Sequence, residues 1–157
     1  MDFMHGLPRS HSGHESKWVI VDRLTKVSRF IPIRKGSPVA ILVMLFVEQF
    51  VRYYSVPRTI ISDRDGRLTS REWRAVQAYL GSQLDFSTAF HLQTGGQTEQ
   101  TNWTMEDLLC LCILDAGKPW ERLLPLIEFS YNNSHHASIG MTPYEALYGR
   151  KCRAPLS

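Results

Sequence analysis

Two short runs of β-branched and aromatic residues near the N-terminus constrain the fold of this chain most. They are WVIVD at residues 18–22 and SRFIPI at residues 28–33, and the polar RLTK lies between them. Such runs are typical of strands, and the short polar link predicts that the two strands are antiparallel neighbours. Pro32 has no backbone N–H, so we expect the second strand to lie near a sheet edge or to end there.

A helix is predicted to follow this pair of strands. Ser37 is a capping hydroxyl and Pro38 suits the first helical position, so the helix should run from there to about Tyr54. Residues 38–47 are apolar throughout. They are about half the length that a membrane-spanning helix needs, and charged residues follow at once, so we expect a buried element and no membrane partner.

The middle of the chain alternates strand and helix signals. TIIS at residues 59–62 predicts a short buried strand, and QLDFS at residues 83–87 predicts a weaker one. Between them, Thr69 and Glu72 have the spacing of a capping box that opens a helix, and Gly81 is placed to end it.

Three further helices are predicted after this segment. The first covers about residues 97–116, and the second covers residues 119–133 with a break or kink near Pro125. The third starts at Thr142-Pro143, which combines a cap with a first-turn proline, and reaches about Tyr148. The order of elements predicts an α/β protein, with helices packed on a sheet.

Composition sets limits on the function. The chain has 157 residues, enough for one domain, and its net charge of +3 and pI of about 8.9 permit a nucleic-acid partner without requiring one. Three cysteines without a regular spacing favour a reducing compartment. Cys110 and Cys112 lack a second Cys/His pair at zinc-finger spacing, and we expect His11 and His14 to be surface residues rather than metal ligands.

Three acidic residues stand out by their positions. Asp2 lies in a possible strand, MDFM; Asp63 follows the strand TIIS; and Glu99 lies in the first turn of a long predicted helix. Side chains at strand ends and helix starts can converge above one sheet edge. Three carboxylates in one pocket suit Mg²⁺, and two such ions can clamp an in-line displacement at phosphorus.

Each of these acids also has a simpler interpretation. Asp63 in SDRDG suits a turn, Glu99 suits the positive end of its helix, and Asp2 is close to the chain terminus. Position alone leaves both interpretations open.

The ordered motifs of the chain go further than the acids alone. They are MDF, WVIVDRLTK with FIPI, SVPRTIISDRDGRLTS, STAFHLQTGGQTEQTN and EFSYNNSHHASIGMTPYEALYGRKCRAP, with 35 residues between Asp63 and Glu99. Together they strongly resemble the integrase catalytic core of gypsy-type long-terminal-repeat retrotransposons, which belongs to the retroviral integrase superfamily. The resemblance covers essentially residues 1–157 and implies a ribonuclease-H-like fold, a mixed central sheet flanked by helices.

The resemblance implies a D,D(35)E triad of Asp2, Asp63 and Glu99 that holds Mg²⁺ or Mn²⁺. The implied reaction is polynucleotidyl transfer, in which the 3′ ends of the element DNA are processed and then joined to target DNA. Candidate nucleic-acid contacts come from the loop and helix around Glu99 and from the basic stretch after Asp63. They are His91, Gln97, Trp103, Arg64, Arg67, Arg71 and Arg74.

The chain departs from the family pattern in several places. Leu92 stands where the family has proline, and Gly95 where it has Asp or Asn, and both changes loosen the loop before Glu99. The helix face that carries Glu99 and Trp103 has no basic residue in this chain. Arg71 and Arg74 would share one helix face, which also suits a solvated charged surface.

The resemblance also bears on domain organisation. Family members carry a zinc-binding module and a C-terminal module that we expect to be absent here, and the first strand is expected to be truncated because one residue precedes Asp2. The implied partners are DNA and, in the full-length protein, further copies that form a homo-oligomer. The implied location is the nucleus, which the protein enters from a cytoplasmic particle. Two alternatives stay open: an inactive remnant with residual nucleic-acid binding, and a stand-alone metal nuclease of the same fold.

Overall fold

The computed structural model describes residues 1–62, 65–86 and 119–153. Its first sheet contains β1 (Asp2–His5), β2 (Ser16–Val21) and β3 (Ser28–Ile33) in the antiparallel order β1-β2-β3. The predicted pairing of the second and third strands is confirmed, with Trp18 opposite Ile31. Pro32 lies on β3, which is an edge strand of this sheet, as its missing N–H requires.

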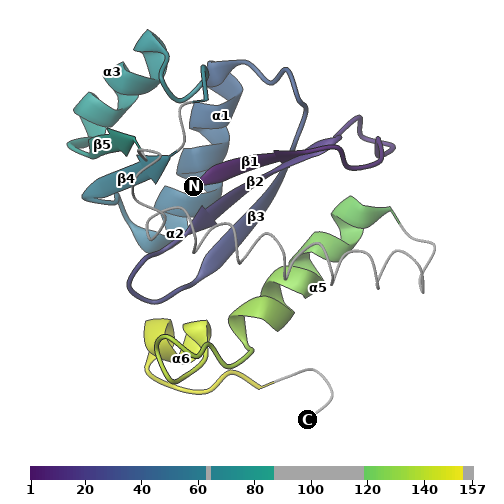
Figure 1. Cartoon of the computed structure of the whole chain (residues 1–157), viewed down its shortest axis with the longest axis vertical. Helices are drawn as coiled ribbons and strands as arrows, with labels where there is room; N and C mark the ends of the chain where they lie inside the picture. The colour runs from purple at the N-terminus through teal and green to yellow at the C-terminus, as the bar shows by residue number, and fades with distance from the viewer. Residues whose placement is uncertain (63–64, 87–118, 154–157) are drawn as a thin grey trace.

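A second pair of strands follows in the middle of the chain. β4 (Thr59–Ser62) and β5 (Gln83–Phe86) are parallel neighbours, with Thr59 opposite Gln83. The connection between them contains α3 (Arg71–Leu80), as a parallel crossover needs. Figure 1 shows α3 beside this pair, with β4 leading back toward the three-stranded sheet.

The helix predicted after β3 is present but starts differently. It consists of α1 (Val39–Phe46), a π-helical stretch η1 (Val47–Val51) and α2 (Arg52–Tyr54). The capping role expected for Ser37 is wrong. Pro38 is the cap residue, without a side-chain hydrogen bond, and Ser37 Oγ accepts instead from the backbone N of Arg34 at 3.2 Å.

The start of α3 also lies one residue later than the capping box predicts. Ser70 is the cap, and its Oγ accepts from the backbone N of Trp73 at 3.1 Å. The Thr69 hydroxyl instead donates to the carbonyl of Gly66 at 3.2 Å. The predicted end is confirmed: Gly81 has a φ of 72°, the left-handed conformation that favours glycine.

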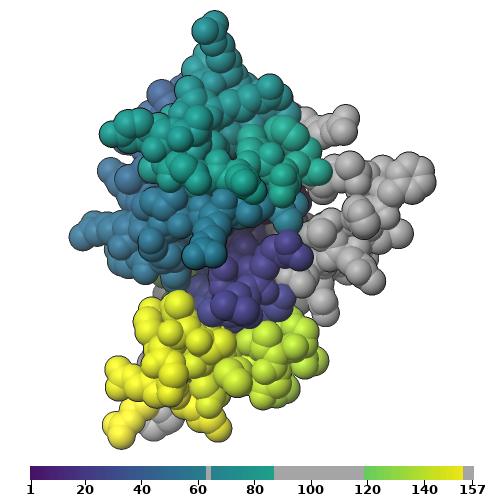
Figure 2. Space-filling view, turned by 90° about the vertical axis from the view of Figure 1, so that its left-hand side faces the viewer, coloured from purple at the N-terminus to yellow at the C-terminus, as the bar shows by residue number. Residues whose placement is uncertain are grey.

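Two helices complete the described structure. α5 (Trp120–Asn132) continues through Pro125 as one helix, so of the predicted break or kink the break is wrong and the kink stays a prediction. α6 (Pro143–Tyr148) starts as predicted, since Thr142 Oγ1 accepts from the backbone N of Glu145 at 3.1 Å. Figure 2 shows the residues around α6 in yellow at the end of the molecule opposite α3 and β5. In the described part of the chain, no helix is both long enough and apolar enough to cross a membrane.

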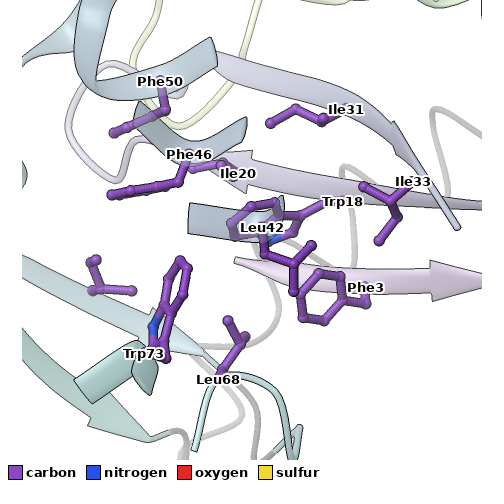
Figure 3. Packing of buried hydrophobic residues seen from close by; sticks show 11 residues of the cluster. Phe3, Trp18, Ile20, Ile31, Ile33, Leu42, Phe46, Phe50, Leu68 and Trp73 are labelled. Carbon is purple, nitrogen blue, oxygen red and sulfur yellow. The ribbon is translucent and has the colours of Figure 1, made fainter. Parts of the chain in front are cut away.

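The first sheet is buried on both faces, because alternate residues of its strands point to opposite sides. On one face, residues of the sheet pack with α1, η1, β4 and α3, and Figure 3 shows the aromatic centre of this cluster. The members are Phe3, Trp18, Ile20, Ile31, Ile33, Leu42, Phe46, Phe50, Ile60, Leu68 and Trp73. On the other face, Val19 and Phe30 pack against α5.

A hydrogen-bonded carboxylate ties the loop between β1 and β2 to the first turn of α5. Glu121 accepts from Ser10 and Ser12 hydroxyls at 2.8 Å each, and the Nδ1 atom of His14 lies 2.7 Å from its Oε2. Desolvation acts to raise the pKa of Glu121, but the hydrogen bonds from His14, Ser10 and Ser12 outweigh it and hold the pKa at about 2. No local pattern indicated this contact, because its partners are more than 100 residues apart in the chain.

This lowered pKa predicts a pH dependence of stability. Since the folded-state pKa of Glu121 lies below its ordinary value of 4.5, its contribution is present above that pH and is lost as the pH falls toward about 2. Wild type should therefore be more stable than Glu121→Gln near neutrality, and the gap should close between these pH values. Melting temperatures measured across this range test it. The exposed Glu48→Gln should run parallel to wild type, and a constant gap for Glu121→Gln would contradict the expectation.

Candidate active site

Asp2 begins the strand β1 and pairs in register with Val19 of β2. Its side chain is partly exposed, and Oδ1 accepts from the backbone N of Phe3 at 2.7 Å. The following residue, Phe3, is buried in the aromatic cluster, so alternation along the strand directs Asp2 to the other face.

The start of β1 lies beside the end of β4. The ammonium group of Met1 donates to the carbonyl of Ile61 at 2.7 Å. Ser62, the next residue, ends β4 and directly precedes Asp63 in the chain. The strand that carries Asp2 therefore lies against the strand that leads to Asp63, as the predicted carboxylate pair requires.

The other predicted site residues are only partly within the described structure. Outside it lie Asp63, Glu99, Arg64, His91, Gln97 and Trp103, together with most of the predicted helix over residues 97–116. Within residues 1–62, 65–86 and 119–153, no three His, Cys, Asp or Glu side chains come together as a metal site. The triad itself stays a prediction.

Arg71 and Arg74 lie on α3 and are both exposed. The guanidinium carbon of Arg74 is 5.9 Å from the centroid of the Phe86 ring, and the two arginines lie three positions apart on one helix face. They are therefore accessible to a phosphate backbone. DNA contact by these residues stays a prediction.

Arg67 is placed differently, because its side chain is partly buried and hydrogen-bonded to other parts of the protein. Its Nε and Nη2 atoms donate to the two carboxylate oxygens of Asp65 at 2.9 and 2.8 Å, and its Nη1 donates to the carbonyl of Lys35 at 3.1 Å. The hydrogen bond from Arg67 lowers the pKa of the Asp65 carboxyl, and this outweighs the effect of burial, which raises it. The predicted contact of Arg67 with DNA stays a prediction.

Sequence reasoning missed these partners of Arg67. Only the contact with Asp65 had a local signal. Asp65 lies two positions before Arg67, and an Asp side chain can accept from a backbone N–H two residues on. The backbone N of Arg67 does donate to Asp65 Oδ1 at 2.8 Å. No local signal existed for the contact with Lys35, which depends on tertiary structure.

The sequence of the chain is similar to those of transposon polyproteins. The chain is 35% identical over 149 residues to the Transposon Tf2-3 polyprotein of Schizosaccharomyces pombe (strain 972 / ATCC 24843), which matches 94% of this chain and 11% of that protein. The chain thus spans about a tenth of the length of the curated relatives that it matches. No family model matches the chain.

Solved structures show the same fold. The HTLV-2 integrase catalytic core domain, in a trimeric form in complex with magnesium, aligns with a TM-score of 0.71 at 15% identity, covering 92% of this chain and 94% of that one. A simian T-cell lymphotropic virus intasome chain aligns with a TM-score of 0.78 at 13% identity, covering 98% of this chain and 56% of that one.

The architecture is therefore the ribonuclease-H-like fold of integrase catalytic cores. Together with the similarity to transposon polyproteins over nearly its whole length, this fold supports the resemblance to integrase cores of long-terminal-repeat retrotransposons. The fold and family expected from the ordered motifs are confirmed.

Proposed function

We propose that this chain is the catalytic core of a metal-dependent polynucleotidyl transferase that acts in DNA integration. It processes the 3′ ends of the element DNA and joins them to target DNA. Its partners are these DNA ends, the target duplex and further copies of the full-length protein, and it acts in the nucleus. The similar proteins support a role in DNA integration at a general level. The metal-dependent processing and joining of DNA ends are proposed.

One observation carries the proposal: the strand bearing Asp2 lies against β4, which leads directly to Asp63. β1 and β4 belong to different sheets but lie side by side here, so carboxylates on the two segments can act on the same phosphodiester. Ser62 adds to this, because its buried hydroxyl has no hydrogen-bond partner among the described residues. Such unpaired polar groups are rare in cores and need a specific explanation, and a functional site is one.

The donor set fits a divalent ion. Asp2, Asp63 and Glu99 would hold it, because carboxylate oxygens are the ligands that Mg²⁺ prefers. When bound, such ions supply Lewis-acid activation of the attacking oxygen and charge stabilisation of the leaving oxygen. An integrase core with the same fold has been solved in complex with magnesium.

The remaining residues of the proposed site bind the nucleic acid. Arg71 and Arg74 offer exposed guanidinium groups that can pair with phosphate oxygens and set the position of the duplex. Trp103 would stack on an unpaired base, and His91 and Gln97 would contact the DNA end. These roles follow from the family resemblance and the chemistry of the side chains.

A strand-transfer assay with a pre-processed DNA end and Mg²⁺ tests the proposal. We expect Asp63→Asn and Asp2→Asn to lower joining by more than about 100-fold, since loss of an outer-shell partner already costs about 10- to 100-fold. The matched control is Asp85→Asn, the same change at an exposed position of β5. It should leave joining unchanged.

The other outcomes separate the alternatives. Metal-dependent cutting without joining would replace the proposal by a nuclease of the same fold. If wild type and the variants bind DNA but neither cut nor join it in the presence of metal, the chain is an inactive remnant. Equal activity of wild type and Asp63→Asn would remove the carboxylate mechanism.

A further inference from the structure

Arg67 contacts three separate segments of the chain through one guanidinium group. It forms a two-point pair with Asp65 in the turn after β4, and it donates to the carbonyl of Lys35 after β3. Its guanidinium carbon lies 3.9 Å from the centroid of the Phe3 ring in β1. Its Nη2 also lies 3.3 Å from His5 Nε2.

The contacts of His5 fix which of its nitrogens carries the proton. Arginine can only donate, so His5 Nε2 accepts and Nδ1 carries the hydrogen, which then points to Ser16 Oγ at 2.8 Å. Ser16 belongs to β2. The network that starts at Asp65 therefore ends in the first sheet.

The pair with Asp65 is partly shielded from water, whereas the contacts with Lys35 and His5 are exposed. The side chains of Arg67 and Asp65 are only 18% and 20% exposed. A planar guanidinium that forms a bidentate pair and stacks on an aromatic ring has a defined orientation, which a flexible ammonium group does not supply. Arg67 is thus a rigid connection and not a solvated surface charge.

The two ends of this connection are the strands of the proposed carboxylate site. Phe3 directly follows Asp2, and Asp65 is two residues after Asp63. Before Asp63 in the chain, Ile61 of β4 is attached to the start of β1 by the hydrogen bond from Met1. The chain on both sides of Asp63 is therefore attached to β1, by Met1 before it and by Arg67 after it.

We propose that Arg67 is a positioning residue, which holds the turn after β4 against β1 and thereby sets the affinity of the site for divalent ions. The inference rests on the proposed function, since it takes Asp2 and Asp63 as ligands. It assigns Arg67 an effect that exists without DNA. A residue that only contacts a phosphate has no such effect.

The test measures Mn²⁺ affinity of the 157-residue chain by calorimetry, without DNA. Arg67→Ala should weaken binding by about 10- to 100-fold, the range for outer-shell partners of metal ligands. Arg67→Lys should recover only part of it, because an ammonium cannot form the two-point pair. Arg58→Ala is the matched control: it removes the same charge from an exposed position just before β4 and should bind Mn²⁺ as wild type does.

Circular dichroism melts establish that each variant is folded at the temperature of the titration. If Arg67→Ala is unfolded there, Asp65→Asn takes its place, because it weakens the pair and keeps an oxygen that can accept from the backbone N of Arg67. A lower melting temperature with unchanged Mn²⁺ affinity would show a purely structural role and would overturn the proposal.

Asp63→Asn in the same titration separates this proposal from the proposed function. If Asp63→Asn loses Mn²⁺ and Arg67→Ala does not, the carboxylate site stands and the positioning role is wrong. If Asp63→Asn binds Mn²⁺ as wild type does, the proposed function fails, and the role of Arg67 fails with it. If only DNA binding weakens in Arg67→Ala, with a salt dependence reduced by about one phosphate contact, Arg67 is a DNA contact instead.

Discussion

Trp18→Ala is expected to remove a large part of the stability of this domain. Trp18 is fully buried, and its ring lies 5.3 Å from Phe3 and 5.7 Å from Trp73, between centroids. It joins β1, β2 and α3 in one cluster, as Figure 3 shows. Replacing a buried tryptophan by alanine costs about 3 to 5 kcal/mol, against a total of about 5 to 15 kcal/mol for a typical domain. Urea unfolding followed by circular dichroism measures the loss.

Two controls define this result. Tyr79→Ala removes an aromatic ring that is 91% exposed, so its effect should stay within about 0.5 kcal/mol. Trp18→Phe keeps an aromatic ring and loses no hydrogen bond, because the indole N–H has no partner in the described part of the chain. It should cost less than Trp18→Ala. A loss below about 1 kcal/mol for Trp18→Ala would show that the cluster collapses into the vacated space.

Glu128→Ala is expected to lower the free energy of unfolding by a similar amount. The cause here is the loss of an ion pair and not the loss of packing. Glu128 is 7% exposed on α5, pairs with the Arg29 guanidinium and accepts from the backbone N of Phe30 at 2.9 Å. Burial raises the pKa of Glu128, against the effects of the Phe30 N–H and Arg29, which lower it. Removing one partner of a buried pair costs about 3 to 5 kcal/mol, since it leaves the other charge uncompensated. Urea unfolding at neutral pH tests this.

Related substitutions separate the charge from the hydrogen bond. Glu128→Gln keeps an oxygen that can accept from Phe30 N but loses the charge, so it should cost less than alanine. The double change Arg29→Met with Glu128→Leu should be closer to neutral, because replacing both partners of a buried pair by apolar groups often is. If Glu128→Ala proves as mild as the exposed Glu48→Ala, then the pair contributes no stability.

The elements followed from local sequence wherever local chemistry decides. The strands at 18–22 and 28–33 became β2 and β3, because β-branched and aromatic side chains fit a sheet that is buried on both faces. Gly81 ended α3 and Thr142 began α6 as predicted, since both act on the backbone within a few residues.

The errors lie where two local signals compete. Thr69 and Ser70 are both residues that can cap a helix, and in the structure Ser70 is the one whose hydroxyl accepts from the backbone N of Trp73. The Ser37 hydroxyl accepts from the backbone N of Arg34 in the preceding turn and does not cap the helix. In α5, Pro125 was expected to break or kink the helix. The helix is not broken, because its buried residues Trp120, Leu123, Leu124 and Ile127 pack on the sheet and hold it together.

The sequence by itself determined the family, the order of elements and the identity of the candidate carboxylates, because motif order and turn chemistry are written in the chain. Only the tertiary structure decided that Met1 bonds to Ile61 of β4 and that Arg67 contacts Phe3 and His5 of β1. The reason is that those contacts join segments about 60 residues apart in the chain. Their energy depends on burial and distance, which no local pattern records.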